Sequence, residues 1–124
     1  MKKFKIAMIG TGGRSVAYAR AFGKSEEIEI VAVADPNRRN IQTMFHLSGI
    51  SGEHIKQYED WHQLLENHHD LDGATVITPN YLHREPAVAL LKRGIAVALE
   101  KPKTTTMRDS EQIVEAVQNS GRIL

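Results

Sequence analysis

A glycine-rich segment near the start of the chain has the residue types and spacing of an anion-binding turn. Residues 10–15 read Gly-Thr-Gly-Gly-Arg-Ser and fit the pattern G-x-G-x-x-G/A, with a serine at the third small position. The first glycine permits a tight turn, the second lets the backbone approach a pyrophosphate, and the third small residue keeps helix and strand close. An ordinary turn between a strand and a helix explains the segment equally well. The candidates are Gly10, Thr11, Gly12, Gly13, Arg14 and Ser15.

An acidic residue stands where a dinucleotide site needs one. Asp35 follows the apolar run 28–34, about 20 residues beyond the glycine segment, where a carboxylate accepts hydrogen bonds from the adenosine ribose. Because a carboxylate repels a 2′-phosphate, Asp35 favours NAD over NADP. Arg38 and Arg39 lie just beyond and could reverse that preference by pairing with the phosphate. Alternatively, Asp35 is the N-cap of the next helix, and one residue could serve both roles.

Alternating apolar patterns predict the fold that brings these residues together. Four nearly continuous apolar runs indicate strands covered on both faces, and a more polar run indicates an edge strand. Helical spacing of apolar residues separates them. We therefore expect right-handed βαβ units in an α/β fold, a doubly wound parallel sheet of Rossmann type with strand order 3-2-1-4-5. The predicted strands are 4–9, 28–34, 55–58, 73–77 and 95–99, with the start of a sixth at 122–124.

Two further loops open onto the crevice where such a sheet binds ligands, outside the carboxyl ends of its strands. The fourth predicted strand is followed by Thr78-Pro79-Asn80, with His83 opening the next helix, and the fifth by Glu100-Lys101-Pro102. Each residue alone is adequately explained as a turn, a cap or a solvated side chain. Three loops that converge on one crevice are harder to explain by chance.

The combination of GTGGRS, VADP, TPNYLH and EKP resembles the glucose–fructose oxidoreductase, inositol dehydrogenase and rhizopine-catabolism family (Gfo/Idh/MocA). The resemblance covers residues 5–124, and TPN-x-x-H and EKP are its specific parts. It implies a nucleotide-binding domain of an NAD(P)-dependent oxidoreductase, a dehydrogenase that acts on CH–OH groups. Such an enzyme moves a hydride between nicotinamide and a sugar or polyol carbon.

The resemblance also implies roles for individual residues. The glycine segment would hold the pyrophosphate, Asp35 the adenosine ribose, and the loop after the fourth strand the middle and nicotinamide end of the cofactor. The EKP lysine, Lys101, would lie beside the nicotinamide and the reacting carbinol, where it could polarise the carbonyl oxygen or pass a proton. The implied cofactor-binding residues are Gly10, Thr11, Gly12, Gly13, Arg14, Ser15, Asp35, Arg39, Thr78, Pro79, Asn80, His83, Glu100 and Lys101.

The family continues into a second α+β domain that holds the substrate and a further catalytic histidine or aspartate. We therefore expect residues 1–124 to be the cofactor domain, with the sugar or polyol substrate bound by a domain absent from this chain. No catalytic-base role passes to any of its six histidines. An unfinished sheet edge would allow copies to pair as a homo-oligomer. A non-catalytic nucleotide-binding or dimerisation module, from a truncated product, is the alternative.

Composition excludes other classes of function. The chain has 16 Lys+Arg against 15 Asp+Glu, a net charge of +1, which indicates neither nucleic-acid nor membrane-surface binding. It has no cysteine, and His62, His68 and His69 near Asp70 match no metal-ligand spacing, so no metal is expected. With no signal peptide or membrane span in the sequence, the expected compartment is the cytoplasm.

A phosphoacceptor receiver domain is a further alternative, because it shares the chain length, the βα repeats and a Lys-Pro pair after the fifth strand. A receiver domain needs acidic residues after its first strand to hold Mg²⁺. This chain has Gly10-Thr11-Gly12 there. We therefore favour the dinucleotide interpretation.

Overall fold

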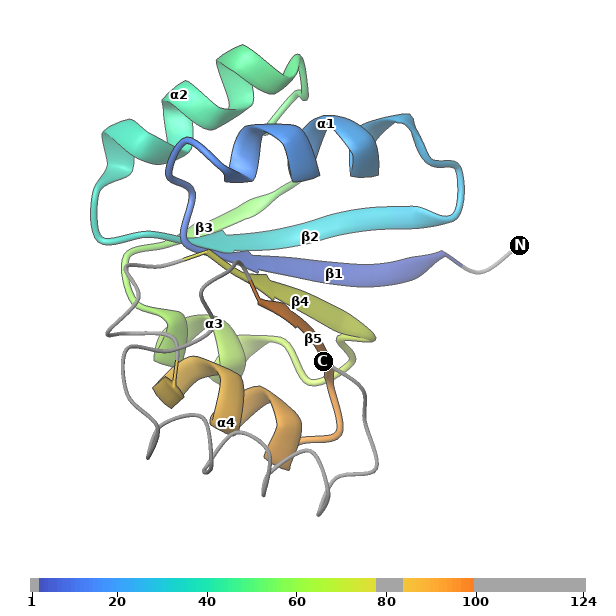
Figure 1. Cartoon of the computed structure of the whole chain (residues 1–124), viewed down its shortest axis with the longest axis vertical. Helices are drawn as coiled ribbons and strands as arrows, with labels where there is room; N and C mark the ends of the chain where they lie inside the picture. Colours follow the sequence, from blue (N-terminus) through green and yellow to red (C-terminus); the bar gives the residue numbers. More distant parts are fainter. Residues whose placement is uncertain (1–2, 78–83, 100–124) are drawn as a thin grey trace.

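Strands and helices alternate along the chain, as the two apolar periods predict (Figure 1). The computed structural model describes residues 3–77 and 84–99. In chain order the elements are β1 (Phe4–Ile9), α1 (Ser15–Lys24), β2 (Ile28–Ala34), α2 (Arg38–Ser48), β3 (Lys56–Tyr58), α3 (Trp61–Asn67), β4 (Gly73–Val76), α4 (Arg84–Lys92) and β5 (Ala96–Leu99).

The strands form one parallel sheet in the order β3-β2-β1-β4-β5, which confirms the predicted order. Strands β3 and β5 each begin one residue later than predicted, after Ile55 and Ile95. Both isoleucines are buried, so they fill the core without pairing in the sheet. Strand β4 ends at Val76, one residue early. The predicted sixth strand lies outside the described residues.

Helices cover both faces of the sheet, with α1 and α2 on one side and α3 and α4 on the other (Figure 1). Successive side chains of a strand point to opposite faces, so β1 contributes to two cores. Met8 packs in the cluster that includes Ile41 and Met44 of α2, whereas Ala7 and Ile9 pack in the cluster under α3 and α4. This double burial explains why the strand sequences are continuously apolar.

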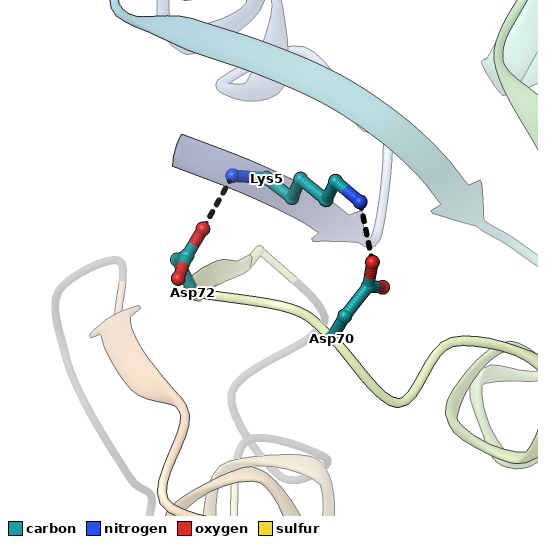
Figure 2. Close-up of polar contacts among 3 residues, drawn as sticks. All are labelled: Lys5, Asp70 and Asp72. Carbon is teal, nitrogen blue, oxygen red and sulfur yellow. Dashed lines mark hydrogen bonds and ion pairs between the residues drawn. The ribbon is translucent and has the colours of Figure 1, made fainter. Parts of the chain in front are cut away.

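At the amino edge of the sheet, polar contacts connect β1 to the segment before β4 (Figure 2). The backbone N–H of Lys5 donates to Asp72 Oδ2 at 2.8 Å, and the backbone N–H of Asp72 donates to the Lys5 carbonyl at 2.8 Å. The Lys5 ammonium pairs with the Asp70 carboxylate. This hydrogen bond and charge raise the pKa of Lys5 and lower that of Asp70. Among the described residues, no helix has the length and apolar character that a bilayer crossing requires.

Candidate functional site

A cleft of about 830 Å³ opens at the carboxyl edge of the sheet. Its walls come from the segments that follow β1, β2, β3 and β4 and from the start of α4. Parallel strands end at a common edge, so residues far apart in the sequence meet there. The lining residues are Ile9, Gly10, Gly12, Ala34, Asp35, Pro36, Asn37, Asn40, Glu59, Asp60, Trp61, Ile77, Glu85 and Pro86.

The glycine segment forms the turn between β1 and α1. Gly10 has φ of 88°, a conformation that favours glycine, and its N–H donates to the Ala34 carbonyl at 2.8 Å, which ties the turn to β2. A Cβ on Gly12 would meet no atom within 4 Å. The space in front of Gly12 is therefore open to a bulky group such as a diphosphate.

The first turn of α1 presents a positive helix end. Arg14 occupies the N-cap without a side-chain capping hydrogen bond, and the first turn contains no acidic residue. The N–H groups of Ser15 and Val16 donate to the carbonyls of Gly12 and Gly13, at 2.9 and 3.3 Å. These two N–H groups are already hydrogen-bonded, so backbone N–H groups that bind an anion must belong to residues before Ser15. An unneutralised helix start favours negative charge nearby.

Ser15 packs at the third small position of the motif. It is buried, and its hydroxyl donates to the Gly12 carbonyl at 2.6 Å. The serine thus meets the requirement for a small residue between helix and sheet, and it also fastens the turn that precedes it. Gly13 and Arg14 are exposed and do not line the cleft.

Asp35 lies in the wall of the cleft and is 7% exposed. Its Oδ2 accepts from the backbone N–H of Thr11 at 2.8 Å and from the Thr11 hydroxyl at 2.9 Å, and its Oδ1 accepts from the Asn37 N–H at 2.8 Å. A carboxylate offers about four lone-pair sites. Room for about one more donor remains, which matches a single ribose hydroxyl.

The structure corrects the alternative role of Asp35 as a helix cap. The N-cap of α2 is Asn37, whose side chain accepts from the Arg39 N–H at 3.0 Å. Asp35 instead supports the approach to the helix, because it holds the Asn37 N–H. Arg39 is exposed and does not line the cleft.

Thr11 lies beneath the cleft rather than in its wall. It is 2% exposed, and both of its donors turn onto Asp35. Thr11 therefore acts on any ligand through Asp35. Its position between two glycines gave the sequence-based interpretation no sign of this contact.

Three acidic residues join Asp35 in the cleft wall, and sequence reasoning missed all three as site residues. Glu59 and Asp60 follow β3, and Glu85 lies in the first turn of α4. The predicted strand order could have identified Glu59 and Asp60. It places β3 next to β2, so the residues that follow β3 lie at the same edge of the sheet as Asp35. Within residues 3–77 and 85–98, no lysine or arginine lines the cleft.

Arg38 pairs with one of the acids of the cleft wall. The Arg38 Nε lies 3.5 Å from Glu59 Oε1, and both side chains are exposed. Asp60 is the N-cap of α3, where its Oδ1 accepts from the His62 N–H at 2.8 Å. This hydrogen bond and the contact with the His62 ring lower the pKa of Asp60. The charged form of Asp60 is thus favoured.

The histidines once considered for a metal serve separate local contacts. His62 stacks on Trp61 and contacts Asp60, whereas the His68 Nε2 lies 2.9 Å from the Tyr58 hydroxyl. Asp70 pairs with Lys5. In the part of the chain that the structure describes, no three His, Cys, Asp or Glu side chains gather as metal ligands.

The remaining candidates lie outside the described residues. They are Thr78, Pro79, Asn80, His83, Glu100 and Lys101. Ile77, just before the first loop, and Glu85, in the first turn of α4 after it, both line the cleft.

Comparison with known proteins identifies the family of the chain. A family model described as "Oxidoreductase family, NAD-binding Rossmann fold" (GFO_IDH_MocA) matches residues 4–124. The 2,7-anhydro-N-acetylneuraminate hydratase of Mediterraneibacter gnavus is 33% identical over 99% of this chain and 31% of its own length.

Solved structures show the same fold. The WlbA dehydrogenase of Bordetella pertussis, in complex with NADH and UDP-GlcNAcA, matches with a TM-score of 0.83 at 23% identity, over 98% of this chain and 36% of its own. A 3-ketoreductase of Actinomadura kijaniata, in complex with NADP, matches with a TM-score of 0.81 at 22% identity, over 99% and 38%.

The chain spans about a third of the length of these proteins. The family match covers nearly the whole chain, and the strand order and the glycine turn agree with it. The receiver-domain alternative is therefore set aside. The chain belongs to the GFO_IDH_MocA oxidoreductase family, in the part that forms the NAD-binding Rossmann fold.

Proposed function

We propose that this chain is the cofactor domain of an NAD-dependent oxidoreductase that acts on a sugar or polyol, with the substrate held by a domain outside these 124 residues. One observation carries the proposal: Gly10, Gly12, Asp35 and Ile77, from three different strand ends, line a single cleft. Similar structures in complex with NADH and UDP-GlcNAcA, or with NADP, support it.

The residues of the cleft suit the two halves of the adenosine diphosphate. The open space at Gly12 and the unneutralised start of α1 suit the pyrophosphate. The Asp35 carboxylate, held by Thr11, suits a ribose hydroxyl. Nicotinamide, when bound, supplies the hydride acceptor or donor. Asn80, His83 and Lys101 remain the proposed residues near that end, with Lys101 as the group that polarises the substrate oxygen or passes a proton.

The charge of the cleft favours NAD over NADP. Asp35, Glu59, Asp60 and Glu85 place carboxylates along the wall, and Arg38 is paired with Glu59 on the rim. An additional 2′-phosphate would bring about two more negative charges among these carboxylates. Arg38, one of the two arginines that could neutralise this phosphate, already has an acidic partner.

A titration of the full chain with NADH and NADPH tests the proposal. We expect NADH to bind at or below about 1 mM, the upper end of usual cofactor affinities, with enhanced nicotinamide fluorescence. NADPH should bind about tenfold more weakly, since a charge repulsion of about 1.4 kcal/mol has that effect. No response to NADH at that concentration would refute the cofactor assignment, and tighter binding of NADPH would refute the NAD preference.

Glu59→Gln sharpens the cofactor test. The change releases Arg38 and removes one negative charge from the rim, so NADPH affinity should rise about threefold while NADH affinity stays within about twofold. Glu53→Gln is the matched control, because Glu53 is an exposed acid that does not line the cleft. An equal response to the two substitutions would show that only the overall charge matters.

The net reaction is a separate question from cofactor binding. One relative carries the name of a hydratase and another that of a ketoreductase. We propose oxidation or reduction of a CH–OH group as the net reaction. Turnover of NAD by the full-length protein with candidate sugars tests it. Conversion of a sugar without accumulation of NADH would favour a hydratase-type reaction instead.

A further inference from the structure

A second hollow, of about 380 Å³, is lined by residues of α3 and α4. Its volume falls within the usual range of small-molecule sites, about 300–1,000 Å³. Trp61 and Glu85 line both this hollow and the cleft, and the other described lining residues belong to the hollow alone. The lining residues are Trp61, His62, Glu85, Val88, Ala89, Lys92 and Arg93.

The charges around this hollow differ from those of the cleft. Lys92 is the last residue of α4 and Arg93 follows it, and both are exposed and line the hollow. Glu85 is the one carboxylate among the described lining residues. A guanidinium has five N–H donors and an ammonium three, and Arg93 directs its Nη1 to the Ala89 carbonyl at 3.4 Å. The hollow therefore favours an anion, whereas the described wall of the cleft is acidic.

Apolar and aromatic side chains line the rest of the hollow. Val88 and Ala89 are half-buried and pack against the core under α3 and α4. On the α3 side, the His62 ring stacks on Trp61 with centroids 3.7 Å apart. The His62 Nδ1 lies 2.7 Å from Asp60 Oδ1, which holds the imidazole in place. Packing and a hydrogen bond thus fix an apolar surface beside the two cations.

We propose that this hollow is a second ligand site, which takes a small organic carboxylate with an apolar body and lowers the affinity for the cofactor. The carboxylate meets Lys92 and Arg93, and the apolar body lies against Val88 and Ala89. Because Trp61 and Glu85 line both the hollow and the cleft, ligands in the two are separated by shared side chains. Two negatively charged ligands placed in this way repel each other, and each lowers the affinity for the other by the same factor.

Benzoate, benzamide and acetate separate the contributions of the charge and the apolar body. The chain has one tryptophan, so a nitrogen–proton correlation spectrum contains one indole signal, from Trp61. We expect benzoate to shift this signal in a saturable way. Benzamide lacks the charge and acetate lacks the ring, so each should need a concentration at least about fivefold higher. Added salt should weaken benzoate binding, because it screens the exposed cations.

Substitution of the two cations assigns the site. Lys92→Gln combined with Arg93→Gln should weaken benzoate binding at least about fivefold. Lys24→Gln is the matched control, because Lys24 is likewise a cation in the last turn of a helix, α1, but lines neither the hollow nor the cleft. It removes a similar favourable interaction with a helix end and should leave benzoate binding unchanged. If the double variant unfolds, as circular dichroism would show, Lys92→Glu at its exposed position decides and should abolish binding.

An NADH titration with and without saturating benzoate measures the coupling. We expect NADH affinity to fall by about two- to threefold, the usual size of one exposed charge interaction. Benzoate affinity should fall by the same factor when NADH is bound.

The outcomes separate the site from the coupling and from the cofactor assignment. An indole signal that does not respond to benzoate, or that responds equally in the chain without the two cations, overturns the site. An NADH affinity that is the same with and without benzoate overturns the coupling. Neither result bears on whether the chain binds NADH, which the titration with NADH alone decides.

Discussion

At the carboxyl edge of the sheet, the Asp35 carboxylate accepts hydrogen bonds from Thr11 and Asn37 and also lines a cleft. At the amino edge, Asp72 accepts from the Lys5 backbone, and Asp70 pairs with the Lys5 ammonium (Figure 2). Neither Asp70 nor Asp72 lines the cleft. Aspartates hold backbone and side-chain donors at both edges, and among the described residues the one at the carboxyl edge, Asp35, also lines the main cleft.

The difference follows from the direction of the helices. In a parallel α/β sheet, helices begin at the carboxyl edge and end at the amino edge, so donor N–H groups face one edge and carbonyls the other. The helix starts at the carboxyl edge attract an anionic group of the ligand. The buried Asp35 carboxylate at the same edge accepts a hydrogen bond from a neighbouring hydroxyl of that ligand. At the amino edge, the polar contacts of Lys5 with Asp70 and Asp72 only connect β1 to the segment before β4. Changes at the two edges should therefore separate binding from stability.

The largest effect is expected at Gly10. Gly10→Val forces a β-branched residue to φ near 88° in the wall of the cleft, so we expect a loss of about 1–2 kcal/mol in the free energy of unfolding and no detectable NADH binding. Urea unfolding and an NADH titration measure the two effects.

Gly49→Val is the control for Gly10, since Gly49 has φ of 77° at the end of α2 and a Cβ there meets no atom within 4 Å. It should lose similar stability and keep its NADH affinity. Equal binding by the two variants would show that the glycine turn does not contact the cofactor.

The next effect compares aspartates across the sheet. Asp35→Ala leaves the buried donors of Thr11 without an acceptor and removes the ribose contact, so we expect a loss of about 1–3 kcal/mol in stability and at least about tenfold in NADH affinity. Asp72→Ala removes a comparable bond to a backbone N–H at the amino edge and should lower stability alone. A similar loss of NADH affinity in both variants would remove the functional distinction between the edges.

A smaller effect is expected at Thr11, which acts through Asp35. Thr11→Val removes the hydroxyl bond and keeps the backbone one, so stability should fall by about 1–2 kcal/mol and NADH affinity by about threefold. Thr11→Ser keeps the hydroxyl and should restore the affinity. If the serine variant binds as weakly as the valine variant, the threonine contributes through its shape rather than through Asp35.

A pH effect should appear in stability but not in binding. Burial lowers the pKa of His68, whose ring contacts Tyr58. The folded chain therefore binds this proton less readily than the unfolded chain. Stability is complete above the ordinary value of 6.5 and falls as the pH drops from there through the lowered pKa. Thermal melts over a pH range that starts above 6.5 and continues into acid measure this loss of stability. The His68→Gln variant should show a weaker dependence of stability on pH. A slope that persists in this variant would assign the titration to another group.

The smallest effect is expected at Asp70. Its carboxylate pairs with Lys5 in an exposed position, where water screens the charges. Asp70→Asn should leave both the unfolding midpoint and the NADH affinity unchanged within error. A clear drop in the midpoint would show that the amino edge depends on this ion pair as well as on Asp72.

The local sequence predicts most of the frame. The bounds of β1 and β2 agree with their apolar runs, because a strand buried on both faces must be apolar throughout. The strand order follows from alternating strands and helices with right-handed connections. Gly10 is where a positive φ was needed. Asp35 was placed correctly at the end of β2, but its burial and its partners were not foreseen.

Residue types and their periods thus determined by themselves that this chain forms a parallel α/β sheet with a glycine turn and an acid at one edge, since backbone geometry and burial depend on local pattern. Only the tertiary structure decided that Thr11 turns inward onto Asp35 and that Glu59, Asp60, Trp61 and Glu85 share the cleft. These residues meet because separate strands end side by side, and the direction of each side chain depends on neighbours that are distant in the sequence.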